Sequence, residues 1–332
     1  MRRSAVTLFL LYLPLFHAKS DDVFSNMTVG ELPDGIRDQI VGMFSIRQSI
    51  MSHCDPPDVE GVDFLLYTRN NVREPIVLNP LDPVEVPTSL KSTVIIIHGF
   101  ISTPNAVGLP KLRNAYLNKG GYNVIMVDWS KTAFTVHAVC SLPMIASQVA
   151  RLVCLLDSKY NVPIETIHLV GHSLGAQMSG FIGQDTLEIC QKHVGRITGL
   201  DPTGSVFFGA PIQDRLDPTD ARFVQIIHTN GGMSGYLTQC GHVDFFVNCG
   251  TLQLNCMMLD FMKILETILN DLLCSHLISI DYMAESLSSD KFMGVSCSGC
   301  PFFCAEDESG RKEIMGEYTP NTTTGSFLVT VT

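Results

Sequence analysis

The sequence predicts an α/β fold with a mostly parallel central sheet and helices on both faces. Three observations lead to it. Short runs rich in β-branched residues alternate with segments of helical periodicity, as parallel sheets require. Several runs are continuously apolar, which is typical of central strands that are buried on both faces. In addition, Ser173 stands between glycines where one such run meets a helical segment.

The expected elements follow in alternating order. The expected strands are residues 63–69, 92–98, 122–129, 166–170, 196–200 and 222–229. The expected helices between them are residues 111–118, 144–160 and 174–184. In open parallel sheets, ligands bind beyond the carboxyl ends of the strands. Functional residues are therefore expected there.

The segment Gly171-His172-Ser173-Leu174-Gly175 has the G-x-S-x-G pattern. At a strand-to-helix turn, this pattern exposes the serine hydroxyl above the sheet, and the flanking glycines let the helix pack closely against the strand. It predicts an α/β-hydrolase fold with Ser173 as the nucleophile. The alternative is an ordinary turn serine.

A serine nucleophile requires a base, and the base requires a carboxylate, in the chain order Ser, Asp, His for this fold. Asp201 closes the 196–200 run, although Asp-Pro also begins ordinary turns. The downstream histidines are His228, His242 and His276. The first two lie in apolar strand-like runs, as core histidines do. His276 follows Cys274-Ser275 and begins a helical segment, which favours it as a base carried on a loop.

The amino terminus has the pattern of a secretory signal. Arg2 and Arg3 precede an apolar run over residues 5–16, and small residues follow near Ser20. The run is too short to span a bilayer, and we expect no transmembrane anchor elsewhere. The sequence thus predicts a signal peptide at 1–20 and one secreted domain at 21–332, because no linker-like segment divides the rest.

Composition narrows the function further. The chain has 22 basic and 33 acidic residues and a formal net charge of −11, so nucleic acid is not an expected partner. In an oxidising compartment, the 11 cysteines favour disulfides over metal sites, and we expect no metal and no cofactor. Asn26 and Asn321 begin glycosylation sequons.

Six motifs follow one another along the chain. They are Gly171-His172-Ser173-Leu174-Gly175-Ala176, Gly199-Leu200-Asp201-Pro202, Asp217-Pro218-Thr219-Asp220-Ala221, Ile226-Ile227-His228-Thr229, Gly241-His242-Val243-Asp244-Phe245 and Cys274-Ser275-His276. In this order they resemble the animal pancreatic-lipase family, which includes triacylglycerol lipases, phospholipases A1 and arthropod secreted relatives. The resemblance covers most of residues 54–317. It implies that Ser173, Asp201 and His276 form a catalytic triad.

The resemblance extends to the oxyanion hole. His98-Gly99-Phe100 resembles the family's oxyanion loop, so the backbone N–H groups of Phe100 and Leu174 are expected to hold the developing oxyanion. The alternative is a plain strand-ending turn. Trp129 is expected to serve packing. Asp128 precedes the serine in the chain and is therefore not expected to be the triad acid.

Residues 257–273 form an amphipathic helical pattern, which on its own is more often a core helix. By resemblance, Cys256 and Cys274 bracket it as lid cysteines and form a disulfide. Such a lid hides an apolar face in water and exposes it at a lipid surface.

The resemblance also suggests other cysteine pairs, and the sequence departs from the family pattern at three positions. By resemblance Cys54 pairs with Cys140 and Cys297 with Cys304; Cys240 with Cys249 is a guess, and Cys154 and Cys190 are left as buried thiols. The departures are Thr203 in place of an alanine after Asp-Pro, Cys249 in place of a glycine, and Ile278 in place of an arginine. No C-terminal β-sandwich domain is expected, and therefore no colipase.

The leading hypothesis is a secreted serine ester hydrolase, a lipase that releases fatty acids from glycerolipids at an interface or micelle. One alternative is a phospholipase A1 that cleaves the sn-1 ester, which the short connection 233–238 favours. The segment 257–273 favours neutral lipid, because Lys263 is its only cation. The alternatives of another class are a non-catalytic lipid-binding or storage protein and a non-catalytic interaction module.

Overall fold

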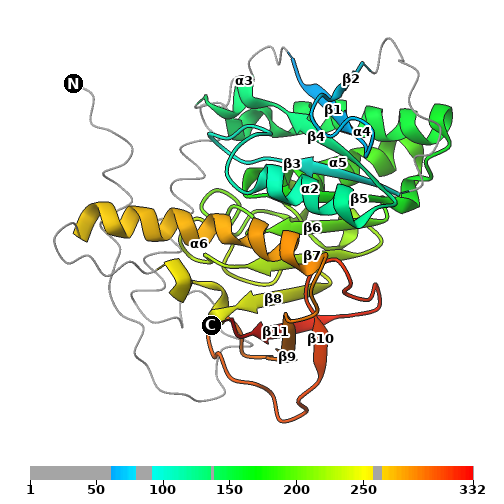
Figure 1. Cartoon of the computed structure of the whole chain (residues 1–332). Helices are drawn as coiled ribbons and strands as arrows, with labels where there is room; N and C mark the ends of the chain where they lie inside the picture. Colours follow the sequence, from blue (N-terminus) through cyan, green and yellow to red (C-terminus); the bar gives the residue numbers. More distant parts are fainter. Residues whose placement is uncertain (1–60, 80–91, 136–137, 257–263, 332) are drawn as a thin grey trace.

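The computed structural model describes residues 61–79, 92–135, 138–256 and 264–331, with side chains left out at 264–272. The expected signal peptide, Asn26, Cys54 and the first part of the expected lid at 257–263 lie outside the described residues. Figure 1 shows a central sheet with helices on both sides.

The described residues form one eleven-stranded sheet. Its centre is a run of parallel strands in the spatial order β4 (Tyr122–Asp128), β3 (Ser92–Ile97), β5 (Ile167–His172), β6 (Arg196–Leu200), β7 (Val224–His228), β8 (Val243–Val247) and β11 (Gly325–Val329). The α/β class and the mostly parallel sheet are confirmed. The six expected strands are present, with ends that differ from the expected ones by at most two residues.

Antiparallel strands lie outside the parallel run on both sides. β1 (Asp63–Tyr67) and β2 (Ile76–Leu78) flank β4, and β9 (Met293–Ser296) and β10 (Lys312–Ile314) flank β11. The sequence did not predict β2 or the strands after β7. Most of these are short, and β10 carries two charged residues in three positions, so they lack the apolar runs that marked the central strands.

Successive side chains of a central strand point to opposite faces, where different helices cover them. In β3, Ile95 and Ile97 pack into the cluster of α4 (Ala138–Tyr160) and α5 (Leu174–Cys190). Val94 and Ile96 pack instead with α2 (Leu109–Lys119) and α6 (Ile264–Ser286). This pattern explains the continuously apolar runs, because both faces of the sheet are buried (Figure 1).

Helix α4 is long and apolar enough to cross a membrane by length and composition, which the sequence reading did not anticipate. Core helices of globular proteins meet the same criterion. Val149, Ala150 and Val153 are fully buried in the cluster that α4 shares with α5 and the sheet. Its apolar composition therefore has a packing role in this fold.

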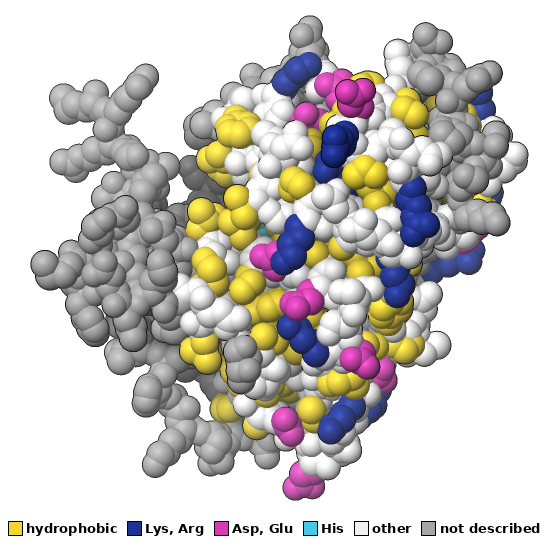
Figure 2. All heavy atoms as spheres, viewed as in Figure 1, with side chains coloured by type: hydrophobic (Ala, Val, Ile, Leu, Met, Phe, Trp, Pro, Cys, Tyr) yellow, Lys and Arg dark blue, Asp and Glu magenta, His cyan; other side chains and the backbone are white. Residues whose placement is uncertain are grey.

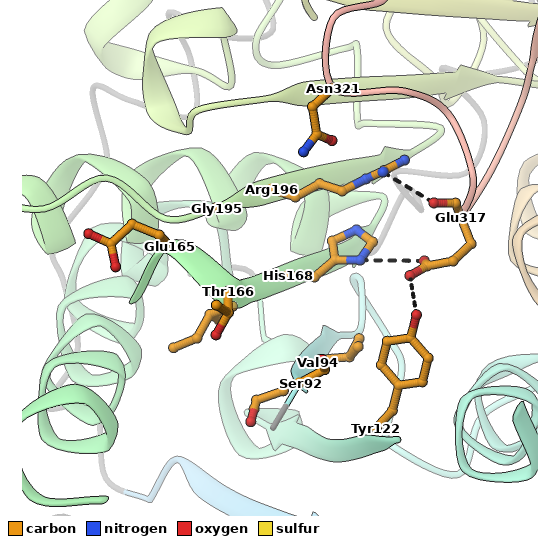
Figure 3. Close-up of a pocket in the computed structure, with 12 residues that line it drawn as sticks. Ser92, Val94, Tyr122, Glu165, Thr166, His168, Gly195, Arg196, Glu317 and Asn321 are labelled. Carbon is orange, nitrogen blue, oxygen red and sulfur yellow. Dashed lines mark hydrogen bonds and ion pairs between the residues drawn. The ribbon is translucent and has the colours of Figure 1, made fainter. Parts of the chain in front are cut away.

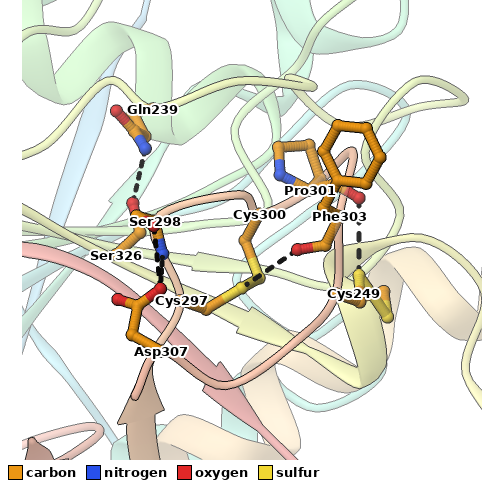
Figure 4. Close-up of a disulfide and its surroundings, with 10 residues drawn as sticks. Gln239, Cys249, Cys297, Ser298, Cys300, Pro301, Phe303, Asp307 and Ser326 are labelled. Carbon is orange, nitrogen blue, oxygen red and sulfur yellow. Dashed lines mark hydrogen bonds between the residues drawn. A yellow bond between two sulfur atoms is a disulfide. The ribbon is translucent and has the colours of Figure 1, made fainter. Parts of the chain in front are cut away.

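Disulfide pairing is where the sequence expectations were most often wrong. The structure pairs Cys297 with Cys300 and Cys249 with Cys304 (Figure 4), where Cys297 with Cys304 and Cys240 with Cys249 were expected. Cys240 is buried and free. Cys249 follows β8 and Cys304 lies beyond β9, and both strands pair with β11.

Cys154 and Cys190 were expected to be buried thiols, but they form a disulfide between α4 and α5. The two helices pack side by side and bring the Cα atoms to 6.0 Å, within the usual span of a disulfide. Cys256 and Cys274 are also bonded. Cys140 is disulfide-bonded, but its expected partner Cys54 lies outside the described residues.

Candidate active site

Ser173 occupies the sharp turn between β5 and α5. Its backbone has φ 59° and ψ −121°, an unusual conformation for a residue with a side chain. A Cβ on Gly171 would lie 2.2 Å from the carbonyl oxygen of Gly175, and one on Gly175 would lie 2.3 Å from that of Ile97. Only glycine fits at these two positions, so the G-x-S-x-G pattern follows from the close packing of the helix on the strand.

Asp201 and His276 are in direct contact. The distance from His276 Nδ1 to Asp201 Oδ2 is 2.5 Å, and the carboxylate is fully buried at the end of β6. The other oxygen, Oδ1, accepts hydrogen bonds from the backbone N–H groups of Thr229 at 2.8 Å and Asn230 at 2.9 Å. A carboxylate held in this way fixes the orientation and tautomer of the imidazole, leaving Nε2 to act as a base.

The loop after β7 also packs tightly around Asp201. A Cβ on Gly235 would come within 2.5 Å of Asp201 Oδ1, so glycine is required for this approach. Sequence reasoning did not find Thr229, Asn230 or Gly235 as part of the site. No local signal marks them, because they reach Asp201 only when β7 pairs with β6.

His276 lies inside α6, where the sequence had placed it on a loop at the start of a helical segment. The long helix is the reason, because it begins before Cys274 and continues to Ser286. His172 contacts His276. Nε2 of His172 donates to the backbone carbonyl oxygen of His276 at 3.1 Å, and the two ring centroids are 4.6 Å apart. Burial keeps the pKa of His172 well below its usual range, so this ring is neutral.

The Ser173 hydroxyl lies beside Thr203, which the sequence analysis noted only as a departure from the family pattern. Ser173 Oγ lies 3.0 Å from Thr203 Oγ1. Within the described residues, Ser173 and His276 make no hydrogen bond with one another, and His276 Nε2 has no partner. The structure thus joins Asp201 to His276 and puts Ser173 at the end of the neighbouring strand. Hydrogen bonds between a nucleophile and its base are often long in ligand-free enzymes.

The loop from His98 to Phe100 lies against Ser173. A Cβ on Gly99 would come within 2.8 Å of Ser173 Cβ. In the part of the chain that the structure describes, the backbone N–H groups of Phe100 and Leu174 have no hydrogen-bond acceptor. These two expected oxyanion donors thus flank the serine without a protein acceptor.

Trp129 fixes this loop and so does more than pack. Its indole N–H donates to the carbonyl oxygen of His98 at 2.9 Å, its backbone N–H donates to His98 Nε2 at 3.3 Å, and the two rings stack. Asp128 lies 3.8 Å from His98 Nε2, away from His276. The neighbouring His98 and Ser130 lower the pKa of Asp128 to about 2. Asp128 therefore lies beside the His98–Phe100 loop and helps to hold it in place.

The other two downstream histidines are satisfied inside the fold. His228 is fully buried, with Nε2 2.8 Å from Asp244 and Nδ1 3.0 Å from the carbonyl oxygen of Tyr236. His242 Nδ1 accepts the backbone N–H of Val224 at 3.0 Å. His228 is thus confirmed as a core histidine, whereas His242 is only partly buried.

A cavity of about 220 Å³ opens at the opposite end of the sheet (Figure 3). Its lining includes Ser92 at the start of β3, His168, Arg196 at the start of β6, and Glu317. These residues surround the amino ends of the strands, whereas Ser173 and Asp201 follow the carboxyl ends. The cavity is therefore separate from the candidate active site. Among the described residues no cluster of metal-binding side chains is present.

Comparison with known proteins identifies the family of this chain. The Lipase family model matches residues 35–324. Pancreatic lipase-related protein 2 of Mus musculus is 35% identical over 79% of this chain and 57% of its own length. Inactive pancreatic lipase-related protein 1 of Canis lupus familiaris is 36% identical over 73% of the chain and 55% of its own length. Phospholipase A1 2 of Vespa affinis is 34% identical over 70% of the chain and 71% of its own length.

The chain spans a little over half the length of the two mammalian relatives. The family match nevertheless extends over most of the chain, including β3, the turn at Ser173, Asp201 and His276. The chain belongs to the pancreatic lipase family.

Proposed function

We propose that this protein is a secreted serine ester hydrolase that releases fatty acids from glycerolipids at lipid–water interfaces. The observation that carries the proposal is the 2.5 Å contact between His276 Nδ1 and the buried carboxylate of Asp201, beside the strained Ser173. That contact leaves Nε2 as the free nitrogen, which is the one that a serine hydrolase uses as its base.

In the proposed reaction, Ser173 Oγ attacks the acyl carbonyl carbon while His276 Nε2 takes its proton. The negative charge moves to the carbonyl oxygen, where the N–H groups of Phe100 and Leu174 stabilise it. The ester C–O bond then breaks, and His276 returns the proton to the leaving alcohol. Water attacks the acyl-serine by the same route, which releases the fatty acid and restores Ser173.

Exposed apolar side chains around the site support action at a lipid surface. Phe100, Ile101 and Phe134 follow the carboxyl ends of β3 and β4, and Leu254 and Leu273 lie beside the Cys256–Cys274 disulfide. Because this disulfide closes a loop two residues before His276, we propose that the loop is the lid. Over the face drawn in Figure 2, basic and acidic side chains are interspersed, which gives no continuous basic surface there.

We propose neutral glycerolipid as the preferred substrate, with phospholipid as the alternative. The segment 257–273 has one cation, Lys263, and many apolar residues, so it favours acyl chains over a phosphate group. The relative from Vespa affinis is named a phospholipase A1, and the short connection 233–238 favours that activity.

A non-catalytic lipid-binding function is the second candidate. It is favoured by the similarity to a dog relative that is named inactive. Binding without turnover would leave Ser173 unreactive.

The test measures fatty-acid release by the purified full chain from trioleoylglycerol emulsion and from phosphatidylcholine vesicles at matched interfacial area. Ser173→Ala should reduce the rate by roughly four to six orders of magnitude. Ser158→Ala, on the exposed side of α4, is the matched control and should retain activity. Equal activity in Ser173→Ala would contradict the proposal. A clear excess on phosphatidylcholine would identify a phospholipase A1 and leave the role of Ser173 unchanged.

A further inference from the structure

The side chain of Thr203 forms a hydrogen bond with that of the proposed nucleophile, Ser173. Its hydroxyl is 3.0 Å from Ser173 Oγ. We infer that Thr203 is a positioning residue that holds the Ser173 hydroxyl in a resting orientation, turned away from His276. This inference rests on the proposed function of Ser173 as the nucleophile.

The backbone of Thr203 is held firmly. Its N–H donates to the carbonyl oxygen of Ser173 at 3.2 Å, and its own carbonyl oxygen accepts Nε2 of the buried Gln177 at 2.8 Å. The other end of the Gln177 side chain accepts the N–H of Leu216 at 2.9 Å. A β-bridge to Gly235 fixes Thr203 from the opposite side. Since a β-branched side chain is also stiff, the hydroxyl is presented to Ser173 in a fixed position.

Each hydroxyl has a single hydrogen to donate. Among the described residues, Ser173 Oγ and Thr203 Oγ1 have each other as their only hydrogen-bond partners, and His276 Nε2 has none. We take Ser173 Oγ as the donor in this pair. A base takes a proton along a hydrogen bond, so the Ser173 hydroxyl hydrogen must then turn from Thr203 to His276 Nε2 before Ser173 attacks. The bond to Thr203 therefore adds to the barrier.

The size of this effect follows from the strength of one neutral hydrogen bond. Breaking such a bond slows a reaction by about 2- to 10-fold. Removal of the Thr203 hydroxyl should therefore make Ser173 more reactive by about that factor, whereas loss of a merely structural residue would not accelerate the reaction.

The experiment measures the second-order rate of labelling by a soluble fluorophosphonate ester, without any lipid interface. Thr203→Ala should be labelled about 2- to 10-fold faster than the wild type. Thr203→Ser restores the hydroxyl and should return the rate to that of the wild type. Thr186→Ala, a buried threonine of α5 whose hydroxyl has no partner among the described residues, controls for a change in packing and should label like the wild type.

The pH profile of labelling distinguishes an effect on the serine from an effect on the base. The inflection due to the base should be the same in the wild type and in Thr203→Ala, with only the rate changed. Three outcomes would overturn the inference. They are an unchanged or slower labelling rate in Thr203→Ala, a rate in Thr203→Ser as fast as that expected of Thr203→Ala, and a shifted inflection. Labelling of Ser173→Ala at the wild-type rate would instead refute the proposed function, and the inference with it.

Discussion

The two ends of the central sheet each carry a histidine beside a carboxylate, and the two pairs differ in what they leave free. At the carboxyl ends of the strands, His276 Nδ1 lies 2.5 Å from Asp201. At the amino ends, His168 Nδ1 lies 3.5 Å from Glu317. The side-chain exposures are 9% and 0% in the first pair and 8% and 9% in the second, so burial does not distinguish them.

The second imidazole nitrogen does distinguish them. Nε2 of His168 lies 2.8 Å from Thr198 Oγ1, so both of its nitrogens are occupied. Nε2 of His276 has no partner among the described residues and belongs to the end of the sheet that carries Ser173. A contact between a histidine and an acid is therefore not enough to identify a base, and the free nitrogen is the more informative feature.

The pair of His168 and Glu317, at the amino ends of the strands, has a structural role. Glu317 accepts the hydroxyl of Tyr116 at 2.6 Å and that of Tyr122 at 3.1 Å (Figure 3 draws Tyr122). Arg196 donates to the carbonyl oxygens of Gly316, Glu317 and Thr319 at 2.7 to 3.2 Å. These bonds attach the segment before β11 to the beginning of β6. Burial raises the pKa of Glu317 and keeps that of His168 well below its usual range.

The largest expected difference between the two pairs is in catalysis. Asp201→Asn should lower ester hydrolysis by roughly a thousand- to ten-thousand-fold, because an amide does not fix the His276 tautomer. Glu317→Gln should leave the rate per folded molecule unchanged. Initial rates on a soluble short-chain ester, normalised to protein titrated with fluorophosphonate, measure both. A comparable loss in the two variants would remove the distinction between the pairs.

Stability should show the reverse order. Arg196→Met removes the three hydrogen bonds to the backbone carbonyl oxygens of Gly316, Glu317 and Thr319, so we expect a loss of about 2 to 3 kcal/mol in the free energy of unfolding. Arg222→Met breaks a more exposed pair with Glu165 and should cost less than about 1 kcal/mol. Urea unfolding followed by circular dichroism measures both, and equal costs would contradict the structural role of Arg196.

The smallest expected effect is a pH trend. Because burial raises the pKa of Glu317, folding favours its protonated form, and this contribution is lost as the pH rises through the folded-state pKa. Gln is neutral throughout. The destabilisation by Glu317→Gln should therefore be greater at roughly pH 4 than at roughly pH 7. Unfolding midpoints across that range decide it, and a cost that grows with pH would show that the ionised carboxylate is the stabilising form.

The features that could be predicted from the sequence are those that depend on residues close together in the chain. The apolar runs gave the central strands, and glycine spacing around Ser173 predicted the turn that the structure has. The order of Ser173, Asp201 and His276 singled out the residues that line the candidate site, and their catalytic roles stay predictions.

Other parts of the site depend on contacts that no local pattern records. Thr229 and Asn230 reach Asp201 because β7 lies beside β6, and the bond from Thr203 to Ser173 arises where two strand ends meet. The pairing of Cys249 with Cys304 likewise joins residues 55 positions apart in the chain, which spacing along the chain does not reveal.

The short antiparallel strands at the borders of the sheet bear on how the protein behaves at high concentration. An open sheet edge offers unpaired backbone groups to which a second molecule can add, which is a route to aggregation. Here the outermost strands, β2 and β10, are three residues each, and β10 exposes Lys312. The long apolar strands lie inside these borders. Although 45% of the chain is hydrophobic, the sheet formed by the described residues presents only short edge strands for intermolecular pairing.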